Sequence, residues 1–108
     1  MWDVVLIGFP ITDLQAPKKR PAVILSSETY NENRPDVILM AITSKIRQPL
    51  EVGEAAVADW EQAGLIKPSV FKPLIATIEQ NQIVRRIGAI SPKDCNTLKN
   101  ILHVVLDT

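Results

Sequence analysis

The stretch that decides the fold is Arg20-Pro21-Ala22-Val23-Ile24-Leu25-Ser26, an apolar run that is typical of a buried strand. Its proline is compatible with a strand because proline is tolerated at the first residues of a strand or on an edge. Upstream, residues 3–9 form a β-branched run of the same character. Downstream, residues 36–42 form a third run, which leads directly into Thr43-Ser44. Three short apolar strands within the first 44 residues predict a mostly β fold.

The middle of the chain carries weaker patterns, which mix polar residues with prolines and glycines. We expect a polar, turn-rich loop at 28–35, a short strand at 48–52, one helical turn at 57–63 stopped by Gly64, and irregular or edge-strand backbone at 65–74. Residues 75–78 and 83–90 then predict a closing hairpin, whose turn falls near Gln80-Asn81.

The C-terminal segment predicts a helix with a well-marked beginning. Ser91 suits the N-cap, Pro92 the first helical position, and Asp94 the acidic first turn. Ile90 and Cys95 stand at the two positions of a hydrophobic staple. An apolar stripe follows at helical spacing: Leu98, Ile101, Leu102 and Val105. Five or six strands with one helix predict a small, strongly bent barrel or half-barrel.

The size and composition are those of a single globular domain. The chain has 108 residues, of which 46% are hydrophobic and 22% charged. It contains no apolar run of the roughly 18 to 20 residues that a membrane span needs. Its N-terminus lacks a basic region ahead of an apolar stretch, so we expect no secretory signal. A single cysteine cannot form an internal disulfide, and we therefore expect a cytoplasmic protein.

Common catalytic constellations are absent from the sequence. The four glycines are not clustered, which argues against a glycine-rich phosphate loop. One histidine and one cysteine make a metal site improbable. His103 lies in the last turns of the predicted helix, where a structural or solvated role is the commoner one, and Cys95 on the inner stripe is expected to be a small buried hydrophobe.

Basic residues are segregated along a chain with no net charge. Twelve lysines and arginines balance twelve acids, so any site for a polyanion must come from local placement. Nine of the ten basic residues outside the predicted helix fall into four groups: Lys18, Lys19 and Arg20; Lys45 and Arg47; Lys67 and Lys72; and Arg85 and Arg86. Two interpretations remain open: loop charges that keep a small barrel soluble, or a site for phosphate groups. Strand alternation directs Arg85 and Arg86 to opposite faces.

Arg20 is the most constrained of these cations, since the following proline favours extended backbone. Its guanidinium is always charged and can grip a phosphate through two parallel hydrogen bonds. The hydroxyls of Thr43 and Ser44 stand at the end of a buried strand. There they either cap the backbone or bind a substrate.

Several segments, in collinear order over nearly the whole chain, resemble the MazF/PemK family of bacterial toxins. The matching segments are 3–6, 9–14, Lys19-Arg20-Pro21 with the strand that follows, 37–44 ending in Ala41-Ile42-Thr43-Ser44, 63–69 with the sequence Ala-Gly-Leu-Ile-Lys-Pro-Ser, 84–88, and Ser91-Pro92.

This resemblance implies a fold, an activity and partners. The fold would be an SH3-like small barrel with a C-terminal helix packed on the sheet, as a single toxin domain over 1–108. The activity would be cleavage of single-stranded RNA without a metal or other cofactor, leaving a cyclic phosphate and a 5′-OH. The partners would be the RNA substrate, a cognate antitoxin that blocks the RNA groove, and a second copy in a homodimer, with no membrane.

The resemblance also assigns residues. Arg20 and Thr43 match the family's catalytic pair. Supporting contacts with RNA are expected from Lys18, Lys19, Ser44, Lys45, Arg85 and Arg86. Two alternatives stay open: a toxin of the same fold that poisons DNA gyrase, and a catalytically inactive module that binds RNA or an antitoxin.

Overall fold

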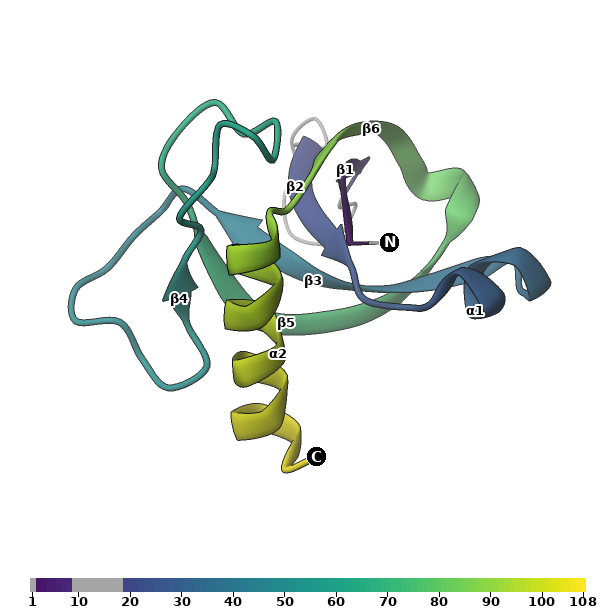
Figure 1. Cartoon of the computed structure of the whole chain (residues 1–108). Coiled ribbons are helices and arrows are strands. Elements are labelled where there is room, and N and C mark those ends of the chain that lie inside the picture. Colours follow the sequence, from purple (N-terminus) through teal and green to yellow (C-terminus); the bar gives the residue numbers. More distant parts are fainter. Residues whose placement is uncertain (1, 9–18) are drawn as a thin grey trace, which may run out of the picture.

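The computed structural model describes residues 2–8 and 19–108, and these form one strongly curled antiparallel sheet with helices at its margins (Figure 1). The strands are β1 (Asp3–Gly8), β2 (Lys19–Ile24), β3 (Asp36–Thr43), β4 (Ala55–Ala56), β5 (Val70–Glu79) and β6 (Ile83–Ala89). The helices are α1 (Glu28–Asn33) and α2 (Pro92–Leu106), with a 3₁₀ turn, η1 (Gln80–Gln82), between β5 and β6. The spatial order of the strands is β4-β5-β3-β2-β1-β6.

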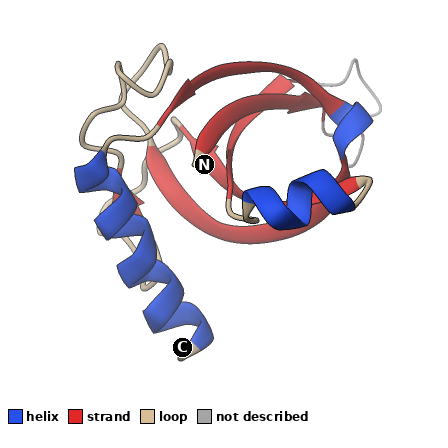
Figure 2. Cartoon of the chain, turned by 45° about the vertical axis from the view of Figure 1, so that its right-hand side comes forward, coloured by secondary structure: helices blue, strands red, loops and turns tan. Residues whose placement is uncertain are grey.

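The sheet bends into an open, barrel-like shape, which Figure 2 shows as strands that curve around an interior. No pairing joins β4 to β6 among the described residues, so the sheet does not close into a full barrel. The predicted mostly β fold with a C-terminal helix is confirmed. Of the two expected forms, barrel and half-barrel, the structure has the strongly bent half-barrel.

Both faces of the central strands are buried, which explains their nearly continuous apolar sequences. On one face Val5, Ile7, Val37 and Leu39 form a core that also contains Ala22. On the other face a larger core lies under α2 and the 57–65 segment. Its buried members are Val4, Val23, Met40, Ile42, Val57, Ala63, Leu65, Phe71, Ile90, Leu98 and Ile101. Alternation along each strand distributes its side chains between these two cores.

The closing hairpin is a prediction that the structure contradicts. β5 pairs with β3 and β6 pairs with β1, so the two strands lie at different places in the sheet although only η1 separates them in sequence. The turn near Gln80 is present, but it carries the chain across the opening of the curled sheet rather than into an adjacent strand. Gln80 fixes this crossing, because its Nε2 donates to the backbone carbonyls of Asn31 and Arg34.

Two further local predictions are wrong. The expected loop at 28–35 contains α1, whose N-cap Ser27 accepts a hydrogen bond from the Tyr30 amide. The strand expected at 48–52 is absent, and a two-residue strand, β4, follows it instead. The expected turn at 57–63 does occur, as a bond from the Ala63 amide to the Asp59 carbonyl.

Helix α2 begins as predicted, at N-cap Ser91 with Pro92 in the first turn. Its inner face buries Leu98 and Ile101 in the larger core, whereas Val105 is 39% exposed and does not extend the buried stripe. Asp94 is fully buried, and its carboxylate accepts from the amides of Ala58 and Asp59, which ties the helix to the 57–65 segment. No helix in the described part of the chain is long and apolar enough to span a membrane.

Candidate functional site

A row of residues across four adjacent strands forms the floor of a pocket. In β1, Leu6 pairs with Pro21 of β2 on one side and with Arg85 of β6 on the other. Beyond Pro21, Ile42 of β3 completes the row and also belongs to the larger core. Because β2 pairs with β3 only from Ala22 onward, the proline lies outside that ladder and removes no bond from it.

The segment 63–69 forms the opposite wall. Gly64, with φ of +84°, ends the preceding turn and lies directly against β6. A Cβ at Gly64 would lie 2.0 Å from the Ile87 carbonyl oxygen, and one at Gly88 would lie 2.4 Å from the Ala63 carbonyl oxygen. Two glycines are therefore required for the segment to approach the sheet this closely.

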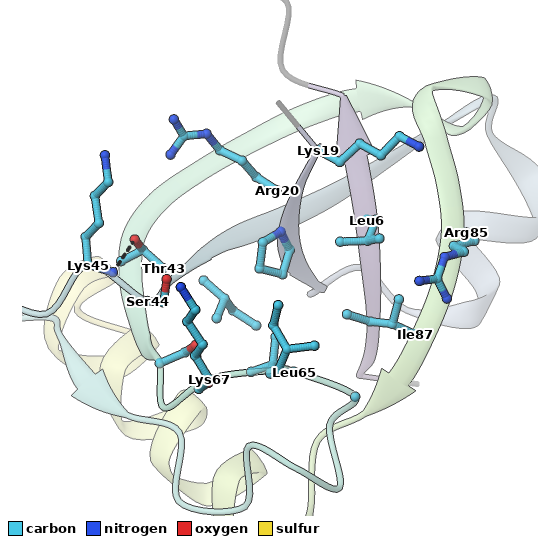
Figure 3. Close-up of a pocket in the computed structure, with 15 residues that line it drawn as sticks. Leu6, Lys19, Arg20, Thr43, Ser44, Lys45, Leu65, Lys67, Arg85 and Ile87 are labelled. Atoms are coloured by element: carbon cyan, nitrogen blue, oxygen red, sulfur yellow. Dashed lines mark hydrogen bonds between the residues drawn. The ribbon is translucent and has the colours of Figure 1, made fainter. Parts of the chain in front are cut away.

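The resulting cavity has a volume of about 450 Å³ and an apolar interior with a polar rim (Figure 3). Its residues come from β1, β2, β3, β6 and the 63–69 segment: Leu6, Lys19, Arg20, Pro21, Ile42, Thr43, Ser44, Lys45, Gly64, Leu65, Ile66, Lys67, Ser69, Arg85 and Ile87. The volume lies within the range of pockets that take small organic ligands.

The rim of this pocket is strongly cationic. Among the described residues, three lysines and two arginines line it and no acid does: Lys19, Arg20, Lys45, Lys67 and Arg85. Within the described residues none of the five forms an ion pair. Cations around one concave, partly apolar surface concentrate their field there, so a neutral chain gains a local site for a polyanion.

Thr43 and Arg20 both line the pocket, from the neighbouring strands β3 and β2. The ladder between these strands ends with Ala22 paired to Ala41, so both residues follow it at the same end. Thr43 Oγ1 accepts a hydrogen bond of 3.1 Å from the Lys45 amide. This is the backbone cap that the sequence left open as one role. It also fixes the oxygen while its own hydrogen remains able to donate to a ligand.

The structure brings together most of the residues that the sequence singled out. Lys19, Arg20, Thr43, Ser44, Lys45 and Arg85 all line the pocket. Arg86 does not: it projects from the other face of β6, and its Nε lies 3.0 Å from Asp3 Oδ1. Lys18 lies outside the described residues. Lys67 was not among the predicted contacts, although the matching segment 63–69 contains it and was the signal available for it.

The remaining reactive side chains lie away from the pocket. Cys95 packs at the margin of the larger core, where burial raises the pKa of its thiol above the ordinary value. His103 is exposed near the end of α2, and its Nδ1 lies 2.6 Å from the Thr108 carbonyl oxygen. No group of three or more His, Cys, Asp or Glu residues that could hold a metal occurs within 2–8 and 19–108.

Solved structures with the same fold include a mycobacterial toxin and a mycobacterial endoribonuclease. The chain is similar to the Mycobacterium tuberculosis toxin MazF-mt6, with a TM-score of 0.78 and 22% identity over 97% of this chain and 96% of that one. It is also similar to an endoribonuclease from a mycobacterial species in complex with its cognate antitoxin, with a TM-score of 0.77 and 19% identity over 98% and 92% of the two chains. At these identities the likeness concerns the fold.

Sequence comparison gives the family. No curated protein matches the chain. The family model described as "PemK-like, MazF-like toxin of type II toxin-antitoxin system" matches residues 1–106. With nearly the whole length matched and the fold in agreement, the chain belongs to the PemK-like, MazF-like toxins of type II toxin–antitoxin systems.

Proposed function

We propose that this toxin is an endoribonuclease that cleaves single-stranded RNA in the pocket between the sheet and the 63–69 segment. The observation that carries the proposal is a rim of five cations around an apolar cavity, with no acid among the lining residues that the structure describes. Cations bind the phosphates of RNA, and an apolar cavity takes a base that is not paired or stacked. Structural neighbours that are endoribonucleases support the same activity.

Cleavage of RNA needs no nucleophile from the protein. The 2′-oxygen attacks the adjacent phosphorus, the bond from phosphorus to the 5′-oxygen breaks, and the products are a 2′,3′-cyclic phosphate and a 5′-OH. The 2′-OH loses one proton and the departing 5′-oxygen gains one. The site must therefore align the strand, stabilise the charge that develops on the phosphoryl oxygens and manage these protons.

Arg20 suits the electrostatic part of this task. Its guanidinium keeps its charge at any working pH and can donate two hydrogen bonds to a phosphoryl group. The same group can deliver a proton to the leaving 5′-oxygen. Thr43, held by the Lys45 amide, can donate its hydroxyl hydrogen to a phosphoryl oxygen. None of the described lining residues is Asp, Glu or His, so in this proposal the 2′-OH proton passes to water. Apart from proton delivery by Arg20, the roles assigned to the lining residues are binding, orientation and charge stabilisation.

The other rim cations would track the phosphates on either side of the cleaved bond. Figure 3 draws Arg20 and Lys45 extending to one side of the rim, with Lys19 and Arg85 on the other. A strand that crosses the pocket would therefore meet cations before and after Arg20. A cognate antitoxin that covers this rim would stop cleavage, and a homodimer would present two such sites.

The experiment is one incubation with a long, unstructured RNA in a buffer that contains a chelator, followed by analysis of the product termini. The proposal requires fragments with cyclic phosphate and 5′-OH ends. A gyrase poison would leave this RNA intact and inhibit supercoiling instead. An inactive module would retain the RNA without releasing fragments.

A further inference from the structure

The 65–69 segment contains an exposed three-residue tip between two buried residues. Leu65 at one end is 8% exposed and belongs to the larger core, and Ser69 at the other end is 5% exposed. Between these two anchors Ile66, Lys67 and Pro68 are all exposed. Ile66 is 88% exposed, more than any other large hydrophobic residue described, and both Ile66 and Lys67 line the cationic pocket.

The backbone of the tip is anchored on both sides although the tip is exposed. Ser69 Oγ donates a hydrogen bond of 3.0 Å to the Lys67 carbonyl, and the Ser69 carbonyl accepts from the Val57 amide. Pro68 fixes its own φ and favours extended backbone at Lys67. The close contact of Gly64 with β6 fixes the other end. A surface prepared in this way loses little conformational freedom when it binds a ligand.

At the mouth of the pocket an aliphatic side chain, Ile66, stands next to a cation, Lys67. These two side chains match the base and the phosphate of a nucleotide. Figure 3 shows the Lys67 side chain extending from the lower wall toward the side of the pocket where Thr43 and Ser44 lie. Within 2–8 and 19–108, no acid lines the pocket to neutralise this ammonium. The apolar surface of Ile66 is available to the flat face of a base. Contact between the two removes both apolar surfaces from water.

We propose that Ile66 and Lys67 hold one nucleotide of the RNA, with Lys67 on a phosphate adjacent to the cleaved one and Ile66 against the base. This inference rests on the proposed function and adds a second contact surface that faces Arg20 across the cavity. Ile66 is then a determinant of which base the site accepts, because the fit of the base against this side chain is part of binding.

The test measures binding of two probes: a 2′-O-methyl oligoribonucleotide, which cannot be cleaved because its 2′-oxygen is blocked, and inorganic polyphosphate, which has no bases. Lys67→Gln should weaken both and lower the slope of log affinity against log salt by about 0.7, the value for one phosphate contact with a single strand. Ile66→Ser should weaken the oligonucleotide by roughly three- to tenfold and leave polyphosphate binding and the salt slope unchanged.

Lys72→Gln is the matched control, since Lys72 is an exposed lysine on β5 that does not line the pocket. Both test residues are exposed, so all three variants should have the melting temperature of the parent protein. The inference is overturned if Lys67→Gln keeps the parent's salt slope. It is also overturned if Ile66→Ser binds the oligonucleotide as tightly as the parent, even where this variant binds the antitoxin less tightly. A parent protein that neither binds the oligonucleotide nor cuts RNA would instead overturn the proposed function itself.

Discussion

The buried carboxylate of Asp94 gives the sharpest prediction about stability. Its Oδ1 accepts from the Ala58 amide at 2.8 Å and its Oδ2 from the Asp59 amide at 2.9 Å, across 35 to 36 residues of sequence. The side chain is 0% exposed. Asp94 therefore joins the first turn of α2 to the segment that leads into the pocket wall.

Removing this carboxylate leaves two backbone N–H groups without their acceptors. Both bonds are only partly buried, so each lost acceptor costs about 1 kcal/mol, the low end for an unsatisfied donor, and Asp94→Ala should lower the free energy of unfolding by roughly 2 kcal/mol. Asp94→Asn keeps one acceptor oxygen and turns an NH₂ group toward the other amide, so about half of that loss should remain. For a chain of this size roughly 1 kcal/mol corresponds to a few degrees in melting temperature.

Urea unfolding followed by far-UV circular dichroism measures these differences, provided that the slope of free energy against urea is unchanged. Asp59→Asn is the matched control in the same segment, because the Asp59 side chain makes no hydrogen bond or ion pair with the described residues, which use only its backbone amide and carbonyl. An Asp94→Ala protein within about 0.5 kcal/mol of the parent would refute this reasoning, since that is the range of an ordinary surface substitution.

Two further predictions concern the pocket wall and a surface ion pair. Gly88→Ala places a Cβ 2.4 Å from the Ala63 carbonyl oxygen, about 1 Å inside ordinary contact, so the pocket wall must move away from β6. We expect a loss of roughly 1–3 kcal/mol in urea unfolding together with slower RNA cleavage, and unchanged stability would contradict the contact. A hydrogen bond from Arg34 holds the pKa of Asp36 below its ordinary value, so this pair stabilises the fold above the unfolded pKa and ceases to do so as the pH falls through the folded pKa. Arg34→Ala should raise the pKa of Asp36 toward the ordinary value in an NMR titration, and an unmoved pKa would rule out the arginine as its cause.

The sequence predicted those strands and helices that are determined by residues within or next to the element itself. β1, β2 and β3 follow from their apolar runs, and α2 follows from the cap at Ser91. α1 was missed because it has six residues, none of them buried, and is held by the amide of Gln80 from 49 residues away. The hairpin error has the same origin, since the choice of β1 rather than β5 as the partner of β6 depends on the curl of the whole sheet.

The candidate site divides in a similar way. Arg20 and Thr43 could be chosen from the resemblance alone, and the structure brings both to one pocket. Which of two adjacent arginines faces that pocket depends on the register between β6 and β1, which pairs Arg85 with Leu6 and leaves Arg86 beside Asp3. Lys67 reaches the pocket only because two glycines let its segment approach β6, a contact that no local pattern reveals.

The most direct test of the account is the single-turnover rate of RNA cleavage by Arg20→Ala, compared with the parent and with Arg47→Ala, an exposed arginine outside the pocket. Loss of a donor that stabilises transition-state charge typically slows a reaction by roughly 10²- to 10³-fold. The account predicts a loss of at least about 100-fold for Arg20→Ala, with an unchanged melting temperature and a near-normal rate for Arg47→Ala. Cleavage by Arg20→Ala at the parent rate would contradict it.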